Sequence, residues 1–299
     1  MTVERHATAA ELVCAHLADN VARLREEEAR VRSGGTSGVH KMRITARRLR
    51  TTLRTCQPLF EASTDALSDD LRWLGRALSG ARDAQMLRER LRRLMSTQPP
   101  ELVMGPVDVL VDDELSAAEQ RGRARALEAL EDTRYLRLLD DLDALVRDLP
   151  MTAEGDMPAR DVFPSLVRRD AKRLRRAVRA ARQAEAGEAR DAALHEARKK
   201  AKRLRYAAEL AVPALGKRAK KLTSSAKEVQ QVLGEHQDTV MSRRFLREHG
   251  ARMHLEGMNG FTLGRLHAIE EARAAVATED FDRAWAQVKD RRMRKRDAG

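Results

Sequence analysis

The sequence predicts an all-α protein made of two related helical halves, and three observations carry this prediction. Only 3% of the 299 residues are aromatic and 35% are charged, a composition that favours helices over strands. Apolar or small residues recur at the spacing of one helix face, as at Met42, Ala46, Leu49 and Leu53. The segment that carries this pattern returns once, further along the chain, which indicates an internal duplication.

Helical periodicity divides the chain into segments that end at glycine or proline. In the first half we expect helices at about 9–32, 39–56, 64–79, 82–95, 105–131 and 133–149. A loop from Pro150 to Pro158 is poor in apolar residues and marks a boundary between domains 1–150 and 151–299. The second half should open with a helix that holds Arg168 and Arg182, followed by the repeated helix ending near Pro213. The remaining helices are expected at 217–234, from 236 onward, at 261–277 and at 279–293.

The helix predicted at 39–56 has one cationic face. His40, Arg43, Arg47, Arg50 and Arg54 lie opposite its apolar positions, and no acidic residue stands among them. Like charges at this spacing repel one another. We therefore expect a bound anion to offset the repulsion, and the length of the stripe suits an extended polyanion.

The same residues return with an offset of 155 positions. The matching pairs are His40 and His195, Arg43 and Arg198, Arg47 and Lys202, Arg48 and Arg203, Arg50 and Arg205, and Asp83 and Asp238. The two aspartates are expected to cap helices or to hold an arginine in place. Ala81 stands where the second half has His236, so the halves need not bind equally.

The candidate anion-binding residues are the cations that recur at helical spacing. The planar guanidinium of Arg can donate two hydrogen bonds to phosphate oxygens, and the ammonium of Lys is a compact positive charge. A third stripe, at Arg168, Lys172, Arg175, Arg179 and Arg182, adds to the two repeated ones. The full set is His40, Arg43, Arg47, Arg48, Arg50, Arg54, Arg72, Arg76, Arg168, Lys172, Arg175, Arg179, His195, Arg198, Lys199, Lys202, Arg203, Arg205, Lys220, Lys221 and Lys227. The basic tail Arg291–Arg296 is either a solvated terminus or an auxiliary contact.

His40 and His195 have three possible roles. Each imidazole could hydrogen-bond a neighbouring helix, donate a proton to phosphate beside the arginines, or bind a metal, although no second metal ligand is visible. We expect no catalytic residues, because the sequence has no metal-ligand spacing, no nucleophile motif and no phosphate-binding glycine loop. No cofactor is expected.

The formal charge of +12 and the pI of about 10.2 indicate an anionic partner. Cys14 and Cys56 lie at apolar helical positions without a metal-binding spacing, which is typical of core cysteines in a reducing compartment. No apolar run is long enough for a signal peptide or a membrane span. A cytoplasmic protein without a membrane partner is expected.

Three segments resemble the CHAD family, the conserved histidine α-helical domain. They are Val39-His40-Lys41-Met42-Arg43 with Arg47-Arg48-Leu49-Arg50, His195 to Tyr206, and Leu233-Gly234 with Gln237-Asp238. The resemblance implies two pseudo-symmetric helical bundles around a basic groove or pore that binds inorganic polyphosphate, without enzymatic activity, on polyphosphate granules. It implies that the two repeated stripes line this groove. Many relatives carry a CYTH domain in front, and this sequence shows none.

Two other functions remain open. The charge alone would permit a nucleic-acid-binding protein, but aromatic residues for base stacking are scarce and no helix-turn-helix or RNA-recognition signature is present. A phosphohydrolase, an accessory to one, or a polyphosphate kinase would need a metal-binding acidic cluster, which the sequence does not show. Chain-length preference and oligomeric state are not specified by these patterns.

Overall fold

The computed structural model describes residues 7–34 and 38–293, with side chains as far as Ala286. This part of the chain contains no β-strand, so the all-α prediction is confirmed. The basic tail Arg291–Arg296 lies outside the described side chains. The helices are α1 (Ala9–Arg32), α2 (Gly38–Cys56), α3 (Asp65–Ala77), α4 (Gly80–Ser96), α5 (Val107–Glu131), α6 (Thr133–Arg147), α7 (Ala159–Gln183), α8 (Glu188–Leu210), α9 (Val212–Leu215), α10 (Lys217–Leu255) and α11 (Phe261–Met293).

The first six helices lie within a few residues of their predicted positions, but two predicted breaks in the second half are wrong. Helix α10 continues through Gly234, which is buried and has no left-handed backbone conformation. A Cβ there would lie 3.6 Å from the guanidinium of Arg198, an ordinary van der Waals contact, so this glycine has a helical conformation in a packed helix and does not end it. Helix α11 continues through Thr278, whose hydroxyl donates to the carbonyl of Ala274 at 2.9 Å inside the helix.

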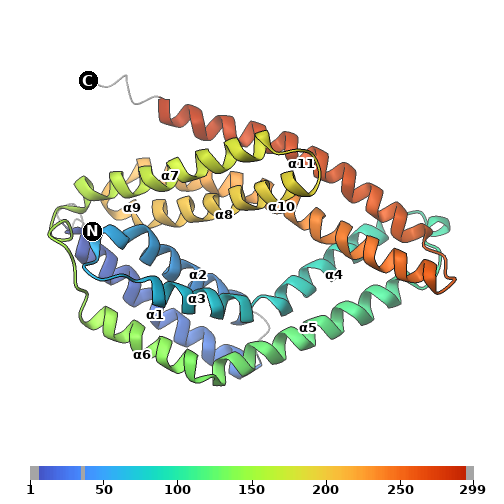
Figure 1. The fold of residues 1–299 in the computed structure, drawn as a ribbon, viewed down its shortest axis with the longest axis horizontal. Coiled ribbons are helices and arrows are strands. Elements are labelled where there is room, and N and C mark those ends of the chain that lie inside the picture. The colour runs from blue at the N-terminus through green and yellow to red at the C-terminus, as the bar shows by residue number, and fades with distance from the viewer. Residues whose placement is uncertain (1–6, 35–37, 294–299) are drawn as a thin grey trace.

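Figure 1 shows two groups of helices. One contains α1, α2, α3 and α6 and the other contains α7, α8, α10 and α11, while α4 and α5 connect the groups at one end of the molecule. Helices α7, α8, α10 and α11 pack around a core that includes Leu174, Leu204, Leu233 and Trp285. Helices α1, α2, α3 and α6 share another core with the start of α7. At the opposite end, α4 and α5 pack against α10 and α11 through apolar side chains. This end therefore combines residues from both halves of the sequence.

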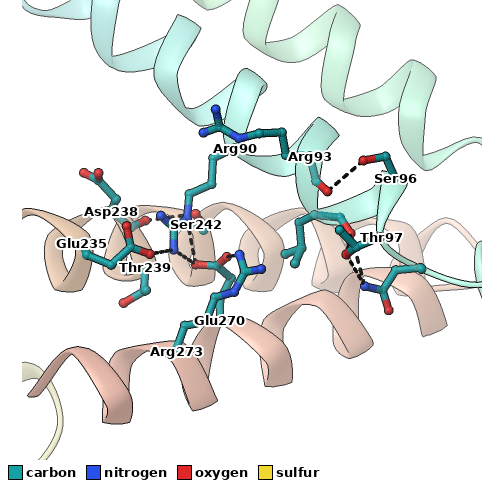
Figure 2. Close-up of polar contacts among 12 residues, drawn as sticks. Arg90, Arg93, Ser96, Thr97, Glu235, Asp238, Thr239, Ser242, Glu270 and Arg273 are labelled. Atoms are coloured by element: carbon teal, nitrogen blue, oxygen red, sulfur yellow. Dashed lines mark hydrogen bonds and ion pairs between the residues drawn. The ribbon is translucent and has the colours of Figure 1, made fainter. Parts of the chain in front are cut away.

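A buried ionic network joins α4 to α10 and α11 at this junction (Figure 2). The guanidinium of Arg90 donates to the carboxylates of Glu270 at 2.8 Å and Glu235 at 2.7 Å, and Glu270 is fully buried. Arg273 donates to the second oxygen of Glu270 at 3.2 Å. A buried carboxylate is stable only when its charge and lone pairs are satisfied. The network therefore fixes the position of α4 relative to α10 and α11.

Candidate anion-binding site

Helices α2 and α8 bring together four cations from distant parts of the sequence. We call Arg43 and Arg47 of α2 and Arg198 and Lys202 of α8 the central cation cluster. Helix α2 packs against α8, and the positive charges of the three arginines each lower the pKa of the Lys202 ammonium. All four side chains are half-buried.

The packing of the two helices explains this arrangement. Helix α2 buries Met42, Ala46 and Leu49 in the core, and each cluster arginine on α2 follows one of these buried positions directly. Helix α8 buries Ala197 and Ala201 in the same way, directly before Arg198 and Lys202. The cations therefore stand at the edge of the packed face, where α2 and α8 approach each other.

Lys202 is the most perturbed member of the cluster. Burial lowers the pKa of its ammonium to about 6, and the neighbouring charges of Arg198, Arg47 and Arg43 contribute to the decrease. Burial also lowers the pKa values of Arg47 and Arg198. Clustering half-buried like charges is unfavourable without a compensating anion. The cluster therefore has the electrostatic properties of a site for negatively charged groups.

The two repeated aspartates are not equivalent. Asp83 of α4 accepts from Arg43 at 2.7 Å, as expected for a carboxylate that holds an arginine in place. Asp238 of α10 lies in the middle of its helix and makes no ion pair within 4.0 Å among the described residues. Burial raises the pKa of its carboxyl group, while the charge of Arg198 opposes the increase. Arg43 in the first half is thus paired with a carboxylate, whereas Arg198 in the second half has no carboxylate within 4.0 Å among the described residues.

The two histidines also differ. The Nδ1 of His195 lies 2.6 Å from Gln237 Oε1, and because an amide oxygen can only accept, this nitrogen carries the proton. His195 therefore bonds a neighbouring helix, the first of its three expected roles. His40 is exposed, and its pKa is lowered by partial burial and by the charges of Arg82, Arg43 and Arg47. Among the described residues no group of three metal-ligating side chains occurs.

A second group of predicted residues lies near the end of α2. Burial lowers the pKa of Arg50 to about 10, with further lowering from Arg72 of α3 and from Arg54. Arg203 of α8 donates to the carbonyl of Arg54 at 2.6 Å. These contacts extend the positively charged surface from the central cation cluster toward α3.

Five other predicted cations have carboxylate partners within the fold. Arg72 pairs with Asp69 at 3.2 Å. Arg48 and Arg205 contact Glu209 at 3.4 and 3.2 Å, and both lie over the ring of Tyr206. Ion pairs at 2.8 and 2.5 Å join Arg203 to Asp170 and Lys199 to Glu196. The charges of these five residues are thus partly compensated.

The remaining predicted cations lie on outer surfaces. Those of α7 and α10, together with one of α3, are exposed: Arg168, Lys172, Arg175, Arg179, Lys220, Lys221, Lys227 and Arg76. None of them is among the groups that shift the pKa of Lys202, Arg198 or Arg47. The structure therefore does not bring them into the central cation cluster.

Two residues near the site were not among the predicted ones. The charge of Arg82 on α4 lowers the pKa of His40, and Tyr206 on α8 opposes the lowering of the pKa of Arg47. Sequence signals existed for both. Arg82 directly precedes the repeated Asp83, and Tyr206 directly follows the repeated Leu204-Arg205 pair.

The fold and the helices that carry the cluster define the class of the protein. The model of the CHAD domain family matches residues 15–247, and the chain belongs to this family. Among solved structures, PptA from Streptomyces chartreusis has a TM-score of 0.78 at 20% identity and covers 94% of this chain and 100% of its own. The CHAD domain from the plant Ricinus communis has a TM-score of 0.72 at 25% identity, with 97% and 94% covered.

Two curated relatives come from strains of Mycobacterium tuberculosis and are named as uncharacterized proteins. Each is 38% identical over 269 residues, which is 89% of this chain and 50% of the relative. The chain thus spans about half the length of the curated relatives it matches. In the described part of the chain, no helix has the length and apolar character needed to cross a membrane.

Proposed function

We propose that the chain binds inorganic polyphosphate at the central cation cluster, without enzymatic activity, and that this binding places it on polyphosphate granules. The observation that carries the proposal is the convergence of three half-buried arginines on Lys202 where α2 packs against α8. Of these four groups only Arg43 has a carboxylate within 4.0 Å among the described residues. A phosphate chain would supply the further negative charge and would accept hydrogen bonds from the guanidinium and ammonium groups.

An extended polyanion fits this surface better than a single phosphate. Cations continue beyond the cluster through Arg50, Arg54 and Arg72, and they come from three helices. Binding would then neutralise several phosphates at once, so affinity should fall steeply as salt increases. Membership of the CHAD family and the resemblance described above support inorganic polyphosphate as the polymer.

The test compares a cluster variant with a matched surface variant. Arg47→Gln with Arg198→Gln removes two cluster charges, whereas Arg121→Gln with Arg147→Gln removes two charges that are exposed and make no ion pair among the described residues. Because a hydrogen bond to a charged group is worth about 1.5–3 kcal/mol, the cluster variant should lose about 100-fold or more in affinity for long-chain polyphosphate. The surface variant should lose much less.

Titrations with long-chain polyphosphate, tripolyphosphate and duplex DNA at about 150 mM salt separate the alternatives. Equal losses in both variants would mean that binding reflects net charge alone. Tighter binding of DNA than of polyphosphate would favour a nucleic-acid function. Phosphate release from polyphosphate in the presence of Mg²⁺ or Mn²⁺ would contradict the absence of enzymatic activity.

A further inference from the structure

Helix α7 carries a second cationic surface on its outer side. Arg168, Lys172, Arg175 and Arg179 are all exposed and recur at i, i+4, i+7 and i+11, so they form one straight row, the α7 stripe. At 1.5 Å per residue the row is about 16 Å long. This length suits several groups of a linear polyanion.

The α7 stripe faces away from the central cation cluster. Asp170 of α7 is buried, accepts a hydrogen bond from Thr55 of α2 at 2.7 Å and forms an ion pair with Arg203 of α8 at 2.8 Å, so its side of the helix faces α2 and α8. Arg168 and Lys172 are each two residues from Asp170, which places them about 200° around the helix axis. A chain bound along the α7 stripe therefore lies on a different side of α7 from the cluster.

The charge of the α7 stripe is not compensated within the fold. Between residues 168 and 182, helix α7 has eight Lys or Arg residues and one acidic residue, the buried Asp170. Among the described residues, no carboxylate oxygen lies within 4.0 Å of a cationic nitrogen of the stripe. Like charges at this spacing repel one another, and an external anion would relieve the repulsion.

The surroundings of the stripe favour a simple phosphate chain as its ligand. From residue 168 to residue 182, no aromatic or large apolar side chain of α7 is exposed. A helix that lies on a membrane needs such side chains on its lipid face, and single-stranded nucleic acids are held largely by stacking on aromatic rings. A linear polyphosphate requires neither, because its charged oxygens are its only recognition groups.

We propose that the α7 stripe is a second polyphosphate-binding surface, so that one molecule bridges two polyphosphate chains. This inference rests on the proposed function, because it assumes that the central cation cluster binds the first chain. Bridging would make the protein a cross-linker of polyphosphate chains.

A two-chain capture assay tests this directly. Short polyphosphate chains are tethered sparsely by one end, the protein is bound and washed at about 150 mM salt, and a fluorescent polyphosphate chain is then added. The stripe variant combines Arg168→Gln, Lys172→Gln, Arg175→Gln and Arg179→Gln. The matched control removes four exposed charges that make no ion pair among the described residues, through Arg121→Gln, Arg147→Gln, Arg218→Gln and Arg247→Gln.

The wild type and the matched control should be captured and should then collect the fluorescent chain. The stripe variant should still be captured through the central cation cluster but should lose the fluorescent signal. The cluster variant, Arg47→Gln with Arg198→Gln, should be captured through the stripe and should also lose the signal. Glutamine is nearly as good a helix former as arginine or lysine, and circular dichroism and thermal unfolding confirm that each variant is folded.

Three outcomes are distinguishable. Fluorescence from the stripe variant equal to that of the wild type would overturn the second surface and leave the proposed function intact. Loss of capture by the cluster variant would also overturn the second surface and leave the proposed function intact, because the α7 stripe would then bind no chain by itself. A wild type that is not captured at all would overturn the proposed function.

Discussion

Binding of polyphosphate should be coupled to proton uptake at Lys202. In the free protein the pKa of this ammonium is about 6, because the group is buried beside Arg198, Arg47 and Arg43. About half of the molecules are then protonated there at pH 6 and about 1% at pH 8. A phosphate group beside the amine favours its charged form and raises its pKa, so the complex holds more protons than the free protein.

The sign and size of the effect follow from this difference. Since the bound state takes up a proton, affinity must rise as the pH falls. If the amine binds phosphate only in its charged form, affinity at pH 6 should exceed affinity at pH 8 by about 50-fold, or about 2.3 kcal/mol. Below pH 6 the dependence should flatten, because Lys202 is then charged in both states.

Isothermal titration calorimetry at pH 6, 7 and 8, in buffers of different ionisation enthalpy, measures both the affinity and the protons taken up. Long chains are needed because only their terminal phosphates titrate near pH 6, as phosphate monoesters do. Lys202→Gln should remove most of the uptake, and Lys221→Gln, at an exposed position on α10, should not. His40 and His195 titrate in the same direction and remain in both variants, so equal uptake by Lys202→Gln and the wild type would refute the reasoning.

Two further predictions concern single carboxylates. Asp83→Asn should free Arg43 from its ion pair and tighten polyphosphate binding about 2- to 5-fold, since an exposed pair is worth up to about 1 kcal/mol; weaker binding in the same titration would mean instead that Asp83 positions Arg43. Glu270→Gln should lower the free energy of unfolding by about 3 kcal/mol, because it leaves the buried charge of Arg90 partly uncompensated, and denaturant unfolding measures the loss. Glu248→Gln, which breaks the exposed ion pair with Arg244, is the control and should leave the free energy of unfolding nearly unchanged; equal losses would show that the Arg90 network does not stabilise the junction.

The sequence predicted most helices because their signals are local. Helix α1 begins and ends where expected, and it is stabilised at its start by reciprocal hydrogen bonds between Thr8 and Glu11. The predicted breaks near Gly234 and Thr278 were wrong because a glycine or threonine ends a helix only when no tertiary contact favours its continuation. Both residues lie in long helices of the α7, α8, α10 and α11 bundle, where packing along the whole helix outweighs the local preference.

The repeated cationic stripes were also visible in the sequence, but their surroundings were not. Periodicity identifies which side of a helix is buried, and it does not identify the helix against which that side packs. Arg48 and Arg205 were predicted to belong to the stripes, yet each contacts Glu209. Glu209 is 161 residues from Arg48 and only four from Arg205. No spacing rule connects all three residues.

The sequence by itself determined that the protein is helical, strongly basic and patterned for an anionic partner, because composition and helical periodicity are properties of neighbouring residues. Only the tertiary structure decided which cations act together. Helices α2, α7 and α8 carry similar stripes, yet those of α2 and α8 meet around Lys202 while that of α7 faces outward. The physical reason is that electrostatic coupling depends on distance and burial, and both are set by how the helices pack.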